Sequence, residues 1–169
     1  MLGLSAKAIL VDNASTDGTA EYAQSHFPWC KVIRSKHNGG YSHGNNIGLK
    51  IAGFPETPLF QHVLLLNPDT ELPANALQTM LTYMQENANV GVLGPKIILA
   101  DGSLDKACKR GLPTPVSAFF HFSGLAQLFP RSPRFARYNM TFLDEDQTAE
   151  VDSTVGACQL IRGEALSQV

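Results

Sequence analysis

The stretch HVLLLNPDT at residues 62–70 decides the fold expected for this chain of 169 residues. Its first five residues form a continuous hydrophobic run, which is typical of a strand buried on both faces of a parallel sheet. The run stops at Asn67-Pro68-Asp69-Thr70, and Pro73 then suits the first turn of a helix. Apolar residues follow at helical spacing: Leu77, Met80, Leu81 and Met84. A strand over 62–66 and a helix after Pro73 are therefore predicted.

Strands and helices also alternate before this stretch. Residues 8–11 read AILV, a short strand that stops at the polar cluster of residues 12–18. Capping residue types in that cluster predict a helix from about residue 19 to Pro28. A second strand is predicted over 31–34, and helical spacing near residues 47–51 predicts a helix that Gly48 weakens.

The second half of the chain has a looser pattern. Residues 90–99 predict a strand region broken by Gly94-Pro95, and a helix is expected between Thr114-Pro115 and Pro130. The segment VDSTVGACQLIRG at 151–163 predicts a strand that enters with Asp152, with a helix beginning near residues 164–166. The alternation indicates an α/β fold with a mostly parallel sheet flanked by helices. We expect one domain over 1–169, with a nucleotide-binding part at 1–110 and a lid or acceptor-side part at 111–169.

Composition narrows the class of protein. Hydrophobic residues make up 44% and charged residues 17%, which predicts a domain that folds in water. Thirteen basic and fifteen acidic side chains give a net charge of −2, which argues against nucleic acid as a partner. The three cysteines lack a CxxC pair, and no export signal is recognised at the N-terminus, so reduced thiols and a cytoplasmic location are expected.

Two carboxylates follow two separate predicted strands. Asp12 comes after AILV, and Asp69 comes after HVLLLNP. In a parallel sheet both loops emerge at the same edge, so the two acids are expected to share one cleft. Such a cleft suits a nucleoside diphosphate with Mg²⁺ or Mn²⁺ neutralising the phosphates. Taken singly, each aspartate is more often a turn former or a helix cap.

Five segments together resemble, in order and spacing, the family 2 glycosyltransferases with the GT-A fold. They are VDNASTDGT, KHNGGYSHGNNIG, LLLNPDTELP, VGVLGPKI and VDSTVGACQLIR, and the resemblance runs over about 9–166. The nearest group is the rhamnosyltransferase-like one that builds bacterial surface polysaccharides. The resemblance implies inverting transfer of a sugar, with rhamnose as the candidate, from a dTDP- or UDP-linked donor to a saccharide or lipid-linked acceptor.

The resemblance also implies roles for residues in the first half of the chain. Asp12 would contact the base of the nucleoside diphosphate sugar, with Asn13 and Ser15 in the same loop. Asn38 and Gly40 belong to a turn where the backbone would approach the nucleoside. Asn45 and Asn46 match a motif whose amides would hold the loop or the ribose; loop and cap hydrogen bonding is the equally weighted alternative for these asparagines.

Two further segments receive roles in the same way. Asn67-Pro68-Asp69 corresponds to the D-x-D signature, with Asp69 as the metal-binding residue and Asn67 in place of the first acid. Metal binding without nucleotide is then expected to be weak. Gly156 and Ala157 would form a small-residue strand beside the transferred sugar, although Ser153 replaces an aromatic residue that is frequent in relatives.

The resemblance further implies that the chain is truncated at both ends. An opening strand of the family is not seen before residue 8, and the general base of inverting transfer is expected beyond Val169. The acidic residues 144–146 precede the expected position, and a solvated loop is the favoured interpretation of them. Two alternatives stay open: an inert nucleotide-sugar-binding or interaction fragment, and an NAD-dependent dehydrogenase, which lacks support because no GxGxxG is present.

An aromatic stretch, SAFFHFSGLAQLF at 117–129, allows three interpretations. A lid packed on the core is favoured. Peripheral contact with a membrane, at its inner face, would suit a lipid-linked acceptor. Exposed aromatic side chains would instead drive self-association into a homo-oligomer.

Overall fold

The computed structural model describes residues 5–169, which group into two compact units. The first unit contains the residues up to Gln61 together with Gly163–Val169, and the second contains His62–Arg162. The expected boundary near residue 110 falls inside the second unit, and the single-domain organisation stays a prediction. None of the helices in the described chain has the length and apolar character needed to cross a bilayer.

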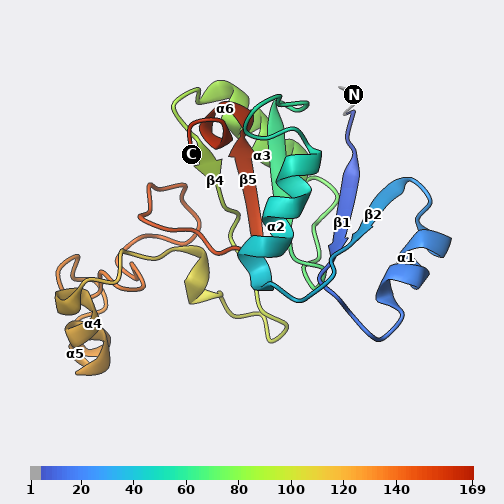
Figure 1. Ribbon diagram of the computed structural model, residues 1–169. Coiled ribbons are helices and arrows are strands. Elements are labelled where there is room, and N and C mark those ends of the chain that lie inside the picture. Colours follow the sequence, from blue (N-terminus) through green and yellow to red (C-terminus); the bar gives the residue numbers. More distant parts are fainter. Residues whose placement is uncertain (1–4) are drawn as a thin grey trace. The chain divides into compact units, whose positions relative to one another are not determined.

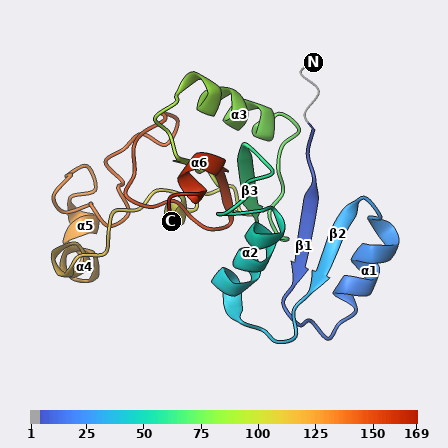
Figure 2. The ribbon, with the colours of Figure 1, turned by 45° about the horizontal axis from the view of Figure 1, so that its top comes forward.

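The first unit is built on a parallel strand pair (Figures 1 and 2). Strand β1 (Ala8–Asp12) pairs with β2 (Cys30–Arg34), from Ala8 opposite Cys30 to Asp12 opposite Arg34. Helix α1 (Thr19–His26) makes the crossover between them and contacts β2. Because the strands are parallel, their carboxyl ends and the loops that follow open at the same edge.

Helix α2 (Gly40–Ile51) packs on β1 in the same unit. Gly48, which weakened the helix prediction, lies beside Val11 of β1, and a Cβ atom there would make an ordinary van der Waals contact with Val11 Cγ2 at 3.6 Å. The helix begins at Gly40, earlier than the apolar spacing indicated, because the polar residues of its first turns carry no hydrophobic signal. Helix α6 (Gly163–Leu166) completes the unit, with Gly163 N donating to Gln61 O at 2.7 Å.

The second unit contains a three-stranded sheet in the order β3-β5-β4. Strand β3 (His62–Leu66) and the short β4 (Val92–Leu93) both pair antiparallel with the central β5 (Cys158–Arg162). Helix α3 (Ala76–Glu86) covers the sheet with the face expected from its spacing. Met80 and Met84 are buried with Cys158 and Leu160 in one core cluster, and Leu77 and Leu81 pack against it.

Irregular chain and short helices connect these strands. They comprise a 3₁₀ turn, η1 (Lys106–Cys108), and the adjacent helices α4 (Pro115–Phe122) and α5 (Leu125–Leu128). Thr114 begins α4 with a capping box, in which Thr114 Oγ1 accepts from Ser117 N at 3.1 Å and Thr114 N donates to Ser117 Oγ at 2.9 Å. The helix expected between Thr114-Pro115 and Pro130 is thus present as two pieces.

The α/β class is confirmed, with two differences in the strands. Parallel pairing within residues 5–169 joins β1 to β2, whereas the sheet of the second unit is antiparallel because Cys158 enters opposite Leu66, the last residue of β3. The strand expected from Asp152 begins only at Cys158, and the region expected over 90–99 is a strand only at Val92–Leu93. Arg110 N and O instead bond to Ser153 before β5 starts, which keeps that segment out of the sheet.

The three cysteines are free thiols. Cys158 is fully buried, and burial raises the pKa of its thiol. Cys30 and Cys108 are half-buried.

Candidate functional site

Asp12 is placed at the carboxyl end of β1, where it shapes the loop that follows. The residue is 6% exposed, and its Oδ1 accepts from Ser15 N at 3.0 Å. Between them Ala14 has φ 65°, in the left-handed region that a turn of this kind requires. Asp12 O also accepts from Ser35 N at 2.8 Å, so the aspartate holds the loops after both β1 and β2.

Asn13 links the same two loops through its side chain. Its Nδ2 donates to Asn38 Oδ1 at 2.9 Å and to Gly40 O at 3.1 Å, while its Oδ1 accepts from Gly39 N at 3.1 Å. Asn38 Oδ1 in turn accepts from Gly40 N at 3.0 Å. The structure therefore brings together three of the predicted residues, Asn13, Asn38 and Gly40, at the carboxyl edge of the parallel pair.

Two glycines let the loop after β2 turn tightly into α2. Gly40 has φ 80°, a conformation that residues with a Cβ atom adopt at a cost. A Cβ atom at Gly39 would lie within 2.4 Å of the His43 ring, whose centroid is 4.8 Å from that of His37. The His43 ring therefore leaves no room for a side chain at Gly39, and the nucleoside contact expected at this turn stays a prediction.

Asn45 and Asn46 lie on α2 itself. Asn45 Nδ2 donates to Tyr41 O at 3.1 Å, one turn back in the helix, and Asn46 is exposed. This bond from Asn45 is an example of the local hydrogen bonding that is the alternative to a ligand contact. A ribose contact by either amide stays a prediction, as does the role of Ser15, which is exposed in the loop after β1.

Replacing Asn13 with alanine is expected to loosen the loop pair. The change removes three hydrogen bonds between the loops, which should lower the free energy of unfolding by roughly 1 kcal/mol and weaken nucleotide binding about tenfold. Urea denaturation and calorimetric titration with UDP measure the two effects. Thr16→Ala, at an exposed position in the same loop, is the control. Unchanged values in Asn13→Ala would show that the loops keep their shape without this amide.

The second unit brings together the two other predicted segments. Asn67 N, just after β3, donates to Ala157 O at 2.8 Å, and Thr70 Oγ1 lies 3.5 Å from the same carbonyl. Thr70 N donates to Asn67 O at 3.2 Å and closes a turn that contains the exposed Asp69. Gly156 and Ala157 lie in a turn before β5, not in a strand as expected, yet they adjoin the Asn67–Asp69 turn. That Asp12 and Asp69 border one cleft stays a prediction.

The donor set of this turn fits a divalent cation that is shared with a diphosphate. Asp69 supplies an exposed carboxylate, and hard cations such as Mg²⁺ and Mn²⁺ prefer oxygen ligands. No group of three or more His, Cys, Asp or Glu side chains suited to a metal occurs within residues 5–169. A cation at Asp69 would therefore take most of its ligands from phosphate and water.

Asp152 is a polar anchor whose partners the sequence did not reveal. Its Oδ2 accepts from Leu112 N at 3.0 Å and from Arg137 Nη2 at 2.8 Å. These bonds, the first above all, hold the pKa of the Asp152 carboxyl below its usual range. The carboxylate thus joins the segment before β5 to two distant stretches of chain, and no motif spacing signals such partners.

Two of the acidic residues 144–146 bind a lysine of the same unit. Lys96 Nζ lies 2.7 Å from an oxygen of Asp146 and 3.2 Å from one of Glu145. The hydrogen bonds from Lys96 agree with the interpretation of this run as a surface loop.

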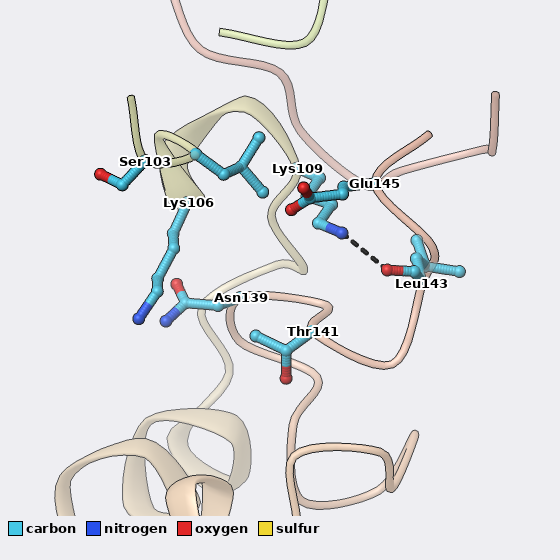
Figure 3. Close-up of a pocket in the computed structure, with 8 residues that line it drawn as sticks. Ser103, Lys106, Lys109, Asn139, Thr141, Leu143 and Glu145 are labelled. Atoms are coloured by element: carbon cyan, nitrogen blue, oxygen red, sulfur yellow. Dashed lines mark hydrogen bonds between the residues drawn. The ribbon is translucent and has the colours of Figure 1, made fainter. Parts of the chain in front are cut away.

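A pocket of about 400 Å³ lies beside that loop (Figure 3). Some of its polar side chains are already bonded: Lys109 Nζ donates to Leu143 O at 2.7 Å, and Thr141 Oγ1 donates to Pro130 O at 2.7 Å. Lys106 and Asn139 also line the pocket. Sequence reasoning missed this pocket because its lining comes from segments around residues 103–109 and 139–145 that carry no motif.

Comparison with protein-family models assigns the chain to a family. The model described as glycosyl transferase family 2 matches residues 5–167, which is nearly the whole chain. The chain belongs to this family. The family has the GT-A fold and generally uses a divalent metal, which agrees with the α/β architecture and with the exposed carboxylate after β3.

Curated relatives of this family 2 chain are similar over most of its length. It is 28% identical over 166 residues to the N-acetylglucosaminyl-diphospho-decaprenol L-rhamnosyltransferase of Mycobacterium tuberculosis, covering 95% of this chain and 53% of the relative. It is 27% identical to the low-salt glycan biosynthesis hexosyltransferase Agl10 of Haloferax volcanii, covering 97% of this chain and 47% of the relative. The chain thus spans about half the length of these relatives. No solved structure matches it significantly.

Proposed function

We propose that this chain forms the donor-binding part of an inverting glycosyltransferase that acts in the synthesis of cell-surface polysaccharides. The donor is a dTDP- or UDP-linked sugar, with rhamnose as the first candidate, and the acceptor is a saccharide or a lipid-linked saccharide. Family membership and the similarity to a rhamnosyltransferase and a hexosyltransferase support this assignment. The reaction is proposed to take place in the cytoplasm, at the inner face of the membrane. The decaprenol in one relative's name supports only the lipid-linked acceptor.

The observation that carries the proposal is the pair of loops joined by Asn13 at the carboxyl edge of β1 and β2. Ligands of open α/β sheets bind outside the carboxyl ends of the strands, where loop amides and carboxylates are available. Here Asp12 and Asn13 are held in place by the loop backbone, and the space beside Gly40, the first residue of α2, is open for at least 4 Å. An Asp12 oxygen can accept the imide N–H of uracil or thymine.

Each segment has a distinct task in the proposed reaction. The Asp12 and Asn13 loops would orient the nucleoside, and the Asn67–Asp69 turn would supply a carboxylate for the diphosphate. Asp69 would hold Mg²⁺ or Mn²⁺, which when bound neutralises the charge that develops on the departing diphosphate. Ala157 O, bonded to Asn67 N, sets the position of that turn.

Calorimetric titration of the chain with UDP, dTDP and NADH, with and without Mn²⁺, tests the proposal. We expect UDP or dTDP to bind, at least about tenfold more tightly with Mn²⁺, because the cation bridges carboxylate and phosphates. NADH is expected not to bind. The proposal fails if neither pyrimidine nucleotide binds or if NADH binds equally well. A separate assay of donor hydrolysis tests whether these 169 residues turn over a donor alone.

A further inference from the structure

The outer face of helix α4 is strongly apolar and exposed. Val116, Phe119 and Phe122 recur every three residues on this face, and Phe119 and Phe122 are 62% and 80% exposed. Leu128 on α5 is 69% exposed. A lid packed on the core, the favoured interpretation of the aromatic stretch, would bury these side chains. The structure does not support that lid within the second unit.

Helix α4 is held in place by contacts at its start and on its inner face, so the exposure of its outer face does not reflect a poorly packed helix. The capping box at Thr114 fixes the start of α4, and Ser117 is buried beneath it. Phe120 packs edge-to-face on Phe135 with ring centroids 4.9 Å apart, and His121 stacks on Tyr138 at 4.4 Å. The inner face is thus anchored by aromatic contacts while the outer face remains apolar and open to solvent.

The charge of the same part of the chain is sharply biased. Residues 106–143 contain six Lys and Arg and no Asp or Glu, whereas the remaining residues contain seven basic and fifteen acidic side chains. Arg137 pairs with Asp152, but Arg131 and Arg134 are exposed and form no ion pair with the residues that the structure describes. Two exposed cations therefore follow the apolar helices, and the Cζ atom of one of them, Arg134, lies 5.7 Å from the centroid of the Phe135 ring.

From these observations we propose that helices α4 and α5, with Arg131 and Arg134, dock this protein on an anionic lipid bilayer. Apolar and aromatic side chains beside Arg or Lys are the combination that lies in the bilayer interface. The acidic remainder of the chain would be repelled by the same surface, which favours an approach through residues 106–143. The biological role of this docking rests on the proposed function, because docking would bring the donor-binding part to a lipid-linked acceptor.

Co-sedimentation of the full chain with lipid vesicles tests this surface. Vesicles of phosphatidylglycerol and phosphatidylcholine in equal parts are compared with vesicles of phosphatidylcholine alone. We expect the anionic vesicles to bind the protein at least about tenfold more tightly, and salt to weaken the binding. Phe119→Ser with Phe122→Ser, and separately Arg131→Glu with Arg134→Glu, are each expected to reduce binding about tenfold or more.

Matched controls distinguish the role of the α4–α5 surface from the general effect of removing an aromatic side chain or reversing a charge. Trp29→Ser removes an aromatic side chain that is 72% exposed in the first unit, and Lys7→Glu with Lys31→Glu reverses two exposed charges outside residues 106–143. Both controls are expected to leave vesicle binding within about twofold of wild type. All variants are also titrated with the nucleotide that binds wild type, as a check of folding. Circular dichroism provides that check if no nucleotide binds.

Three results would overturn the inference. The first is that the wild-type chain binds neutral and anionic vesicles equally well. The second is that the variants of the α4–α5 surface bind anionic vesicles as well as the controls do. The third is a dimer in sedimentation velocity that the Phe119 and Phe122 changes dissociate, with no vesicle binding, which would identify a second copy as the occupant. If the wild-type chain binds the nucleotide but no vesicles, only the docking surface is refuted. If the wild-type chain binds anionic vesicles but no nucleotide, only the proposed function is refuted.

Discussion

Replacing Asp69 with alanine is expected to weaken Mn²⁺-dependent binding of the nucleotide by at least about 100-fold. Changes in the outer shell of a metal site alone typically cost 10- to 100-fold, and Asp69 is the single carboxylate of the Asn67–Asp69 turn. Binding in the absence of the metal should hardly change, because the proposed nucleoside contacts belong to the loops after β1 and β2. Calorimetric titration with UDP and dTDP, at several Mn²⁺ concentrations, measures the difference.

The control for this prediction lies two residues away. Glu71 is also exposed after β3, so Glu71→Gln removes the same charge from the same loop. We expect it to bind the nucleotide as wild type does. Equal, metal-independent binding by wild type and Asp69→Ala would remove Asp69 from its assigned role. Equal loss in Asp69→Ala and Glu71→Gln would show that the charge of the loop matters, not a specific ligand.

Replacing Arg162 with methionine is expected to destabilise the protein by roughly 2–4 kcal/mol, because a half-buried guanidinium loses several carbonyl partners. Arg162 Nη2 donates to Met84 O at 2.7 Å and to Asn87 O at 3.2 Å, and Nε donates to Val90 O at 3.0 Å. These carbonyls lie at and just beyond the carboxyl end of α3, where helical acceptors lack internal donors. Arg162 therefore caps α3 and ties it to β5.

Urea denaturation of three variants checks this prediction. Arg162→Lys keeps the charge but loses the planar fork of donors, so its loss of stability should be intermediate. Arg110→Met, at an exposed position in the same unit, should change the free energy of unfolding by less than about 0.5 kcal/mol. If Arg162→Met unfolds at the same urea concentration as Arg110→Met, the cap contributes nothing measurable.

The strongest local patterns predicted their elements well. The run at 62–66 forms β3 with the expected bounds, and the apolar spacing of α3 correctly indicates its buried face. Both signals are strong because periodic burial is written directly into the order of residues. The beginning of α2 at Gly40 was missed because polar first turns and paired glycines resemble a loop in sequence.

Long-range partners could not be predicted in this way. The antiparallel entry of β5 depends on the route of the chain between residues 94 and 157, which has little regular structure. The contacts of Asp152 with Leu112 and Arg137 likewise join residues 40 and 15 positions apart. Hydropathy and motif spacing report on local periodicity, and they carry no information on which distant carbonyl a side chain will reach.

The sequence by itself determined the family, the α/β class and the places where polar loops interrupt buried strands, because these follow from residue order and local burial. Tertiary structure decided that Asn13 closes the turn before α2, that Asn67 bonds to Ala157, and that the outer face of α4 stays exposed. Each of these outcomes depends on the distance between atoms far apart along the chain. Such distances exist only once the packing of both units has formed.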